Sequence, residues 1–292
     1  MQYLEDFLNE LPCRWLNLAT ASRKENVREL TAISEQLTES YPLYEGFIRN
    51  YRVGLEATSF DNHRELLVNY YEKAPASLNR ELLIRRNEHG LHSCPFCGDK
   101  KKPDTLDHFI PKDQWPEYSI FSNNLVPQCR SCAPIKGENY YCVESCTAKF
   151  IHPIYSDLLQ RFRFKVTLAF NRETNIPSFS VVLRKLQMTE GDEDQRVVFH
   201  IKNLKVKQRL IKFCQDDYRR WQTRLSKRRF DLRVALQQRL NETPENDRGI
   251  DWKSAFIEGL LNNEDAINYL HSLRPNTMHE PLFPIVEELE LE

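Results

Sequence analysis

Two Cys-x-x-Cys pairs constrain the folding of this chain more than any other feature. Cys94 and Cys97 form the first pair, and Cys129 and Cys132 form the second, with 31 residues between the pairs. Four thiolates are the usual ligand set of a closed, tetrahedral structural zinc site. One such pair can arise by chance, but two matched pairs rarely do. The sequence therefore predicts that one zinc ion holds these four cysteines and fixes the intervening segment.

The cysteine content and the apolar pattern indicate the compartment. The 292-residue chain has eight cysteines, four of which lie outside the pairs and are expected to be ordinary thiols. In a reducing compartment, paired cysteines at this spacing favour metal binding over disulfides. The sequence has no run of about 18 uncharged apolar residues, and the N-terminus lacks the order of a signal peptide. We therefore expect a cytoplasmic protein without a membrane partner.

Apolar spacing and composition divide the first half of the chain into two regions. Residues 1–88 carry apolar side chains at helical spacing, including the segment 4–11, which predicts a helical N-terminal region. Residues 89–155 are richer in proline, cysteine and short polar turns, so we expect their order to depend on the metal. The second region contains both cysteine pairs and is the predicted functional module.

The second half of the chain predicts a hairpin followed by helices. In the region 156–279, apolar and polar residues alternate from 162 to 168 and again near 179–183, which predicts a β-hairpin. Apolar residues then recur every seven positions between 198 and 241, which predicts one long amphipathic helix or two helices sharing a face. Residues 280–292 contain five glutamates and no basic residue, and form an acidic tail. The predicted fold class is α+β and mainly helical.

Basic residues gather in the second half of the chain although the net charge is only −1. Residues 200–240 contain thirteen lysines and arginines but only three aspartates. Such a basic stripe can follow a phosphate backbone. A solvated face that serves only solubility is the rival interpretation. We favour DNA contact. The candidate DNA-binding residues are Arg130, Lys136, Arg219, Arg220, Arg224, Lys227, Arg228 and Arg229.

The segment between the cysteine pairs carries residues suited to phosphodiester chemistry. Asp107 and His108 are adjacent and supply an oxygen ligand and a base, while Pro111 and Asn124 follow before the second pair. In this order the residues resemble the HNH endonucleases, whose catalytic unit is the ββα-metal fold, in the variety braced by a double-knuckle zinc. The resemblance covers roughly residues 94–155, about a fifth of the chain.

The resemblance implies a role for each matching residue. His108 would be the general base that takes a proton from the attacking water, and Asp107 would ligate a catalytic Mg²⁺ or Mn²⁺. Asn124 would tie the catalytic loop together by hydrogen bonds. Lys136 and Gly137 match the end of the family's Cys-x-x-Cys-Asn-x-x-Lys-Gly signature. His152, in a His-Pro-aromatic element common in larger relatives, could touch phosphate or could anchor the module.

One residue departs from the family pattern. Ala133 stands where family members carry asparagine or histidine as a second protein ligand of the catalytic metal. A methyl group cannot coordinate a cation. The site could therefore be inactive, could bind Mg²⁺ more weakly through Asp107, waters and DNA phosphate, or could carry a deliberate inactivating substitution. We favour the last interpretation because the other motif residues are intact.

These features lead to three hypotheses about function. The first is a metal-dependent HNH endonuclease that acts on DNA. The second is a non-catalytic, zinc-stabilised DNA-binding or scaffold subunit of a larger complex, which Ala133 supports. The third adds context: helical regions on both sides of the module are similar to anti-phage effectors such as the nuclease subunit of Septu-type systems, which implies an ATPase partner because this chain has no phosphate loop of its own. Cutting both strands would also favour a homo-oligomer.

Overall fold

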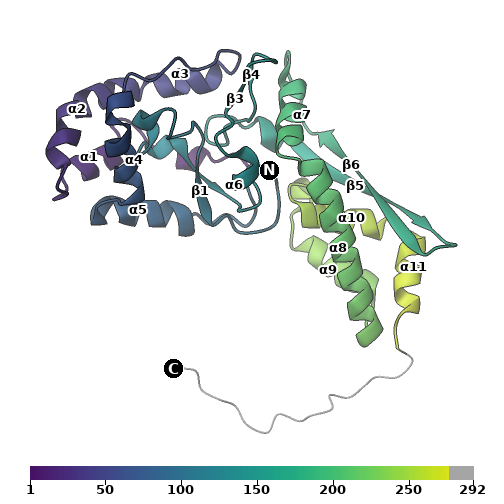
Figure 1. The fold of residues 1–292 in the computed structure, drawn as a ribbon. Helices are drawn as coiled ribbons and strands as arrows, with labels where there is room; N and C mark the ends of the chain where they lie inside the picture. Colours follow the sequence, from purple (N-terminus) through teal and green to yellow (C-terminus); the bar gives the residue numbers. More distant parts are fainter. Residues whose placement is uncertain (276–292) are drawn as a thin grey trace, which may run out of the picture.

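A computed structural model describes residues 1–275 and has an α+β, mainly helical architecture. Within these residues the strands form three separate two-stranded antiparallel sheets (Figure 1). The acidic tail predicted at 280–292 lies outside the described residues. No helix among the described residues combines the length and apolar character needed to cross a membrane.

The N-terminal region is helical, as predicted. One face of its longest helix buries Leu30, Ile33 and Leu37, which are spaced three and four residues apart. The segment 4–11, expected to be helical, instead forms only a 3₁₀ turn at Glu5–Phe7 that ends before Pro12. The α-helices of this region are α1 (Arg14–Thr20), α2 (Val27–Ser40), α3 (Leu43–Arg49), α4 (Arg64–Glu72) and α5 (Ala76–Asn87).

The middle region contains little regular structure. Strands β1 (Thr105–His108) and β2 (Leu125–Gln128) pair so that Asp107 lies opposite Val126 and His108 opposite Leu125. The short helix α6 (Ala133–Lys136) follows the second cysteine pair. A small hairpin of β3 (Tyr141–Cys142) and β4 (Thr147–Ala148) comes next. Strands this short form few backbone hydrogen bonds, and the loops around them carry buried apolar side chains such as Phe96 and Phe121.

The C-terminal region begins with the predicted hairpin and continues with helices. The seven-residue apolar pattern is divided among three helices, because Lys205 takes a left-handed backbone conformation (φ 52°) after α7, and α9 begins at Leu232 after the extended residue Asp231. The side chain of Asp231 caps α9 by accepting a hydrogen bond from the Val234 N–H (3.0 Å). The elements are β5 (Phe162–Asn171), β6 (Ile176–Lys185), α7 (Glu193–Asn203), α8 (Val206–Lys227), α9 (Leu232–Asn241), α10 (Trp252–Leu261) and α11 (Glu264–Ser272).

Short 3₁₀ turns connect several of these elements and shape the loop between β1 and β2. The turns other than the one at the N-terminus are Asp61–His63, Pro116–Tyr118, Ser122–Asn124, Leu158–Arg161 and Glu245–Asp247. Two of them lie between the paired strands β1 and β2. The loop between these strands is therefore ordered by its own backbone turns.

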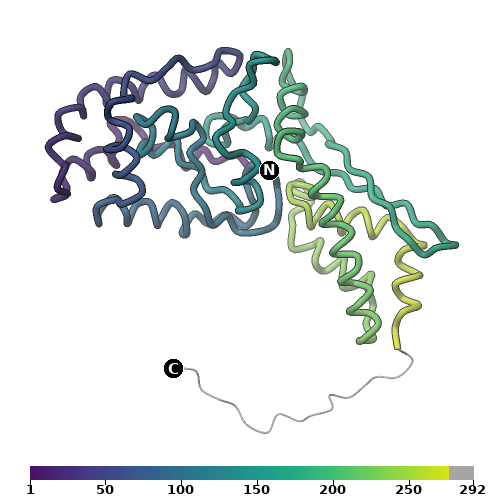
Figure 2. The backbone as a smooth tube through the Cα atoms, in the orientation of Figure 1, coloured from purple at the N-terminus to yellow at the C-terminus, as the bar shows by residue number. Residues whose placement is uncertain are grey.

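Buried polar side chains join the C-terminal helices to the middle region, beside which they run in Figure 2. The His200 ring accepts a hydrogen bond from the Ile151 N–H (3.1 Å) and donates one to the Phe96 carbonyl (2.7 Å). The indole of Trp252 donates to the Cys97 carbonyl (2.6 Å). The two regions therefore share a core around the first cysteine pair.

His152 anchors the module in the protein interior. Its side chain is fully buried, and its ring lies 4.2 Å from that of Phe109, centroid to centroid. The hydroxyl of Tyr44 lies 3.2 Å from Nε2, and the Ile154 N–H donates to Nδ1 (3.1 Å). Of the two interpretations left open for His152, the structure favours the anchor over contact with phosphate.

Candidate functional site

The four cysteines of the two pairs form one buried cluster. All four Sγ atoms lie within 4.8 Å of one another, and Cys97 Sγ is 3.8 Å from Cys129 Sγ. A tetrahedral zinc ion with Zn–S bonds of about 2.3 Å requires sulfurs about 3.8 Å apart. The donor set and its spacing therefore suit a structural zinc ion, as predicted from the sequence.

Backbone turns aim each pair of sulfurs inward. The Gly98 N–H donates to the Cys94 carbonyl (2.8 Å), and the Cys132 N–H donates to the Cys129 carbonyl (2.9 Å). Gly98 takes a left-handed conformation (φ 74°), and a Cβ atom there would lie 2.7 Å from the Phe164 ring. Glycine is therefore required at this turn both for its backbone angle and for space.

Arg209 of α8 lies over the sulfur cluster. Its guanidinium donates to Cys132 Sγ (3.3 Å) and approaches the Sγ atoms of Cys97 (3.7 Å) and Cys129 (3.9 Å). The neighbouring thiolates hold the pKa of Arg209 above its usual range. A zinc ion with four thiolates carries a net charge of 2−, which this partly buried cation partly neutralises. The sequence does not single out Arg209, because one more basic residue in a basic helix carries no distinguishing signal.

We expect Arg209→Met to weaken zinc retention by roughly 10- to 100-fold, because groups that hydrogen-bond metal ligands tune metal affinity by that amount. Competition between the folded protein and a chromogenic chelator measures the change. Arg219→Met is the matched control, since Arg219 lies on the same helix with its side chain 72% exposed and pairs with Asp216. Equal retention by both variants would show that Arg209 does not support the cluster.

Asp107 occupies an interior position on β1. Its side chain is 10% exposed, and Lys136 Nζ lies 3.1 Å from Oδ2 at ion-pair distance but outside hydrogen-bond geometry. Among residues 1–275, Oδ2 has no hydrogen-bond partner. Burial raises the pKa of Asp107 to about 6 despite the opposing effect of Lys136. A buried carboxylate oxygen with unused lone pairs is suited to binding a cation.

His108 is held in one orientation and one tautomer. Its Nε2 donates a hydrogen bond to the Ser119 carbonyl (2.9 Å), so the proton resides on Nε2 and Nδ1 is left as an acceptor. The Tyr71 ring packs edge-on at 4.3 Å between centroids. Burial lowers the pKa of His108 to about 3, so the ring is neutral at physiological pH. A neutral imidazole with a free Nδ1 can accept a hydrogen bond from water, although a pKa this low makes it a weak base.

Asn124 holds the loop that follows β1 in place. Its Oδ1 accepts hydrogen bonds from the Ile110 N–H and the Tyr44 hydroxyl, both at 2.7 Å. Its Nδ2 donates to the carbonyls of Ile110 (2.9 Å) and Tyr118 (3.1 Å). The amide is fully buried, so both its ends are satisfied by the protein. Asn124 therefore fixes the loop that carries the Ser119 carbonyl, to which His108 donates its hydrogen bond.

Lys136 has a different position from the one expected. The sequence assigned it to a DNA-binding surface, whereas its side chain is fully buried and its Nζ donates to the His108 carbonyl (3.0 Å). A buried ammonium must be paired, and Asp107 provides the opposite charge. Lys136 is therefore an interior partner of the Asp107-His108 pair and does not present its charge to a ligand at the surface.

Ala133 begins α6, one helical turn before Lys136. Residues three apart on a helix lie on the same face, so Ala133 points toward the side on which Lys136 meets Asp107. Its methyl group supplies no ligand atom. Positions 107 and 133 together would therefore give a catalytic cation one protein ligand, the Asp107 carboxylate, instead of two.

The remaining candidate DNA-binding residues lie on the surface. Arg219 and Arg220 pair with aspartates one turn earlier, at 3.5 and 3.3 Å. Arg130 pairs with Asp104 at 2.6 Å while its own side chain stays 79% exposed. The other four candidates, also exposed, are Arg224, Lys227, Arg228 and Arg229. Exposed ion pairs of this kind contribute little stability, so their cations stay accessible to phosphate.

Comparisons with known proteins add little to this geometry. No protein-family model matches the chain, and no solved structure matches it. The chain is similar to Protein ea31 of Escherichia phage lambda, with 40% identity over 60 residues, which are 20% of this chain and 20% of that protein. The chain thus aligns with only a fifth of this relative's length. The resemblance to HNH endonucleases rests on the motif residues alone.

Proposed function

We propose that this protein is a metal-dependent endonuclease of the HNH type that hydrolyses phosphodiester bonds in DNA. The observation that carries the proposal is the pairing of Asp107 and His108 on one short strand. The imidazole is oriented by the Ser119 carbonyl, and the carboxylate keeps an oxygen without a hydrogen-bond partner among the described residues. A base and a metal ligand so placed are the parts that hydrolysis of a phosphodiester requires.

The roles of these residues follow from their geometry. His108 Nδ1 takes the proton from the attacking water, since Nε2 is already engaged. Asp107 would hold Mg²⁺ or Mn²⁺, which, when bound, polarises the phosphate and stabilises the leaving oxygen. Asn124 keeps the Ser119 carbonyl aligned with His108 by bonding both edges of the loop.

A non-catalytic role is the second candidate. Ala133 supplies no ligand, and the Lys136 ammonium 3.1 Å from Asp107 Oδ2 opposes the approach of a second cation. In that case the zinc-stabilised module would serve as a DNA-binding platform or scaffold in a larger complex. The exposed basic residues of α8 are compatible with both candidates.

An assay that measures binding and cleavage together separates the two candidates. We would incubate the protein with labelled duplex DNA and single-stranded RNA in Mg²⁺ or Mn²⁺, with EDTA as the control. Cation-dependent cutting of DNA supports the endonuclease. DNA binding without cutting, by this chain and by Ala133→Asn alike, supports the platform.

The cellular context is a further part of the proposal. The protein would act as an antiviral defence effector, a role that fits a nuclease module flanked by helical regions. It would work with an ATPase partner, because this chain lacks a nucleotide-binding phosphate loop of its own. Co-purification of a nucleotide-hydrolysing partner from the native host would support it. Full cleavage activity of the isolated chain, with no such partner, would argue against it.

A further inference from the structure

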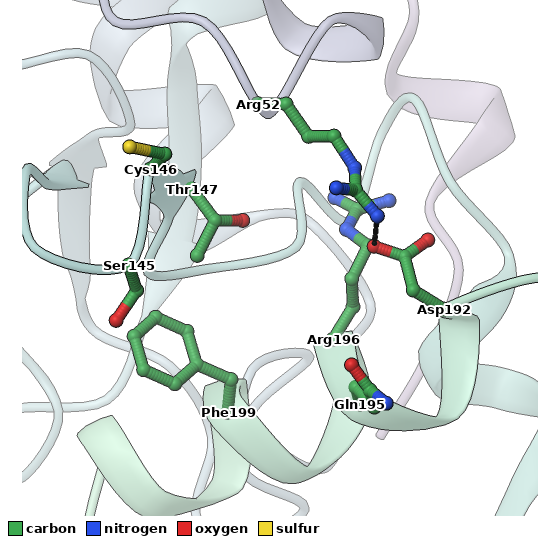
Figure 3. A pocket seen from close by; sticks show the side chains of 8 residues that line it. All are labelled: Arg52, Ser145, Cys146, Thr147, Asp192, Gln195, Arg196 and Phe199. Carbon is green, nitrogen blue, oxygen red and sulfur yellow. Dashed lines mark hydrogen bonds and ion pairs between the residues drawn. The ribbon is translucent and has the colours of Figure 1, made fainter.

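A small cavity lies apart from both the sulfur cluster and the Asp107-His108 pair. It has a volume of about 220 Å³ and is formed by the loop after α3, the β3–β4 hairpin and the start of α7 (Figure 3). The charged side chains of Arg52, Arg196 and Asp192 lie on one side of it. The hydroxyl groups of Ser145 and Thr147, from the hairpin, lie on the other side. Its lining residues are Arg52, Ser145, Cys146, Thr147, Asp192, Gln195, Arg196 and Phe199.

Arg196 is the central feature of this cavity. Its guanidinium stacks on the Tyr51 ring, 3.5 Å from the ring centroid, and partial burial lowers its pKa. Among residues 1–275, its guanidinium forms no hydrogen bond and no ion pair. A guanidinium has five N–H donors, and those of Arg196 are not used by any acceptor among the described residues. The cavity therefore holds a positioned guanidinium whose N–H donors are available to a ligand.

Asp192 arranges the groups around Arg196 without neutralising the site. Its Oδ2 lies 2.7 Å from Arg52 Nη2, and its Oδ1 accepts a hydrogen bond from the Tyr51 hydroxyl (2.5 Å). The carboxylate thus holds Arg52 at the cavity and fixes the ring on which Arg196 stacks. Two guanidinium groups face one carboxylate, so the cavity keeps a net positive charge.

The remaining walls complete a site for a phosphorylated organic molecule. Thr147 and Gln195 offer a hydroxyl and an amide that have no hydrogen-bond partner among the described residues, and both can donate to oxygen. The Phe199 ring supplies an apolar surface beside them (Figure 3). Paired guanidinium groups recognise phosphate, and aromatic rings stack on nucleobases.

We propose that this cavity binds the 5′-phosphate of a nucleotide, with Arg196 and Arg52 on the phosphate and Phe199 against the base. The nucleotide can be free or can be the phosphorylated end of a nucleic-acid strand, because both present the same group. None of the lining residues belongs to the Asp107-His108 pair or to the sulfur cluster. The inference is therefore independent of the proposed nuclease activity.

Isothermal titration of the full chain with adenosine 5′-monophosphate and with adenosine tests the proposal. The monophosphate should bind at least about tenfold more tightly than the nucleoside, since hydrogen bonds to charged groups have that strength. A 5′-phosphorylated oligonucleotide that competes for the site identifies a strand end as its source, and failure to compete identifies the free nucleotide. Equal binding of adenosine and its monophosphate, or no binding of either, overturns the proposal.

Variants of the two arginines locate the binding. Arg196→Gln should lower affinity for the monophosphate at least about tenfold while zinc content stays unchanged. Arg52→Gln should also weaken binding. Because the Arg52 side chain is 66% exposed, this variant should fold, and it tests the site if Arg196→Gln does not fold. Arg49→Gln, equally exposed and paired with Glu45 on α3, should bind like the parent. Unchanged affinity in Arg52→Gln and in folded Arg196→Gln contradicts the assignment.

Discussion

Replacing Cys132 by serine is expected to abolish zinc binding and to unfold the middle region of the protein. Zinc-finger peptides gain roughly 10–16 kcal/mol of apparent folding free energy from their zinc ion. We expect this middle region to depend on such an ion because its four ligands cross-link two separate segments, whose strands contain four residues or fewer. Zinc per chain, measured by atomic absorption, and the melting temperature by circular dichroism report the effect.

Cys142→Ser is the matched control for this experiment. Cys142 lies in the β3–β4 hairpin, is partly exposed and does not belong to the sulfur cluster. We expect this variant to keep one zinc per chain and the melting temperature of the parent. The loss in Cys132→Ser should extend into the C-terminal helices, because Arg209 and Trp252 contact the cluster and its backbone. A parent protein that contains no zinc and melts like Cys132→Ser would contradict the assignment of the metal.

Replacing Ala133 by asparagine is expected to increase Mg²⁺-dependent DNA cleavage by at least roughly 10-fold. The asparagine oxygen would give the cation a second protein ligand on the face of α6 that meets Asp107, and ligand support of this kind alters activity by 10- to 100-fold or more. The gain should depend on Mg²⁺ or Mn²⁺ and should vanish with EDTA. Initial rates of plasmid nicking measure it.

A variant with equal bulk and no oxygen separates coordination from packing. Ala133→Leu fills the same space and should cleave no faster than the parent. Both substitutions start from a partly exposed position at the first residue of α6, so neither should disturb the sulfur cluster. Equal rates in the asparagine and leucine variants would mean that position 133 does not contribute a metal ligand.

The sulfur cluster was predictable from sequence because its ligands are marked by type and spacing. The hairpin of β5 and β6 was predictable too, since alternation of apolar residues follows directly from the two-residue repeat of a strand. The long amphipathic run was predicted as one or two helices but forms three. The left-handed residue Lys205 separates α7 from α8, and a break with extended backbone at Arg228 and Asp231 separates α8 from α9. The apolar spacing continues across both breaks and does not reveal them.

Other features depend on contacts between distant residues and left no local signal. Arg209 reaches Cys132 across 77 positions of sequence, and Lys136 is buried through pairing with Asp107 on another element. Both residues look like ordinary basic side chains in the sequence. The cavity around Arg196 likewise joins segments that are far apart in the chain, so only the folded structure brings Arg52 to it.

The most direct test of the account is the rate of Mg²⁺-dependent DNA cleavage by Ala133→Asn with and without the additional change His108→Ala. The account predicts a loss of about 10²- to 10⁴-fold on removing the imidazole, since that is the usual contribution of a general base. Zinc content should stay the same in both proteins, which shows that the sulfur cluster is intact when the imidazole is removed. Equal cleavage rates in the two proteins, or no cleavage by either one while both bind zinc fully, would contradict the assignment of His108 and with it the proposed catalytic site.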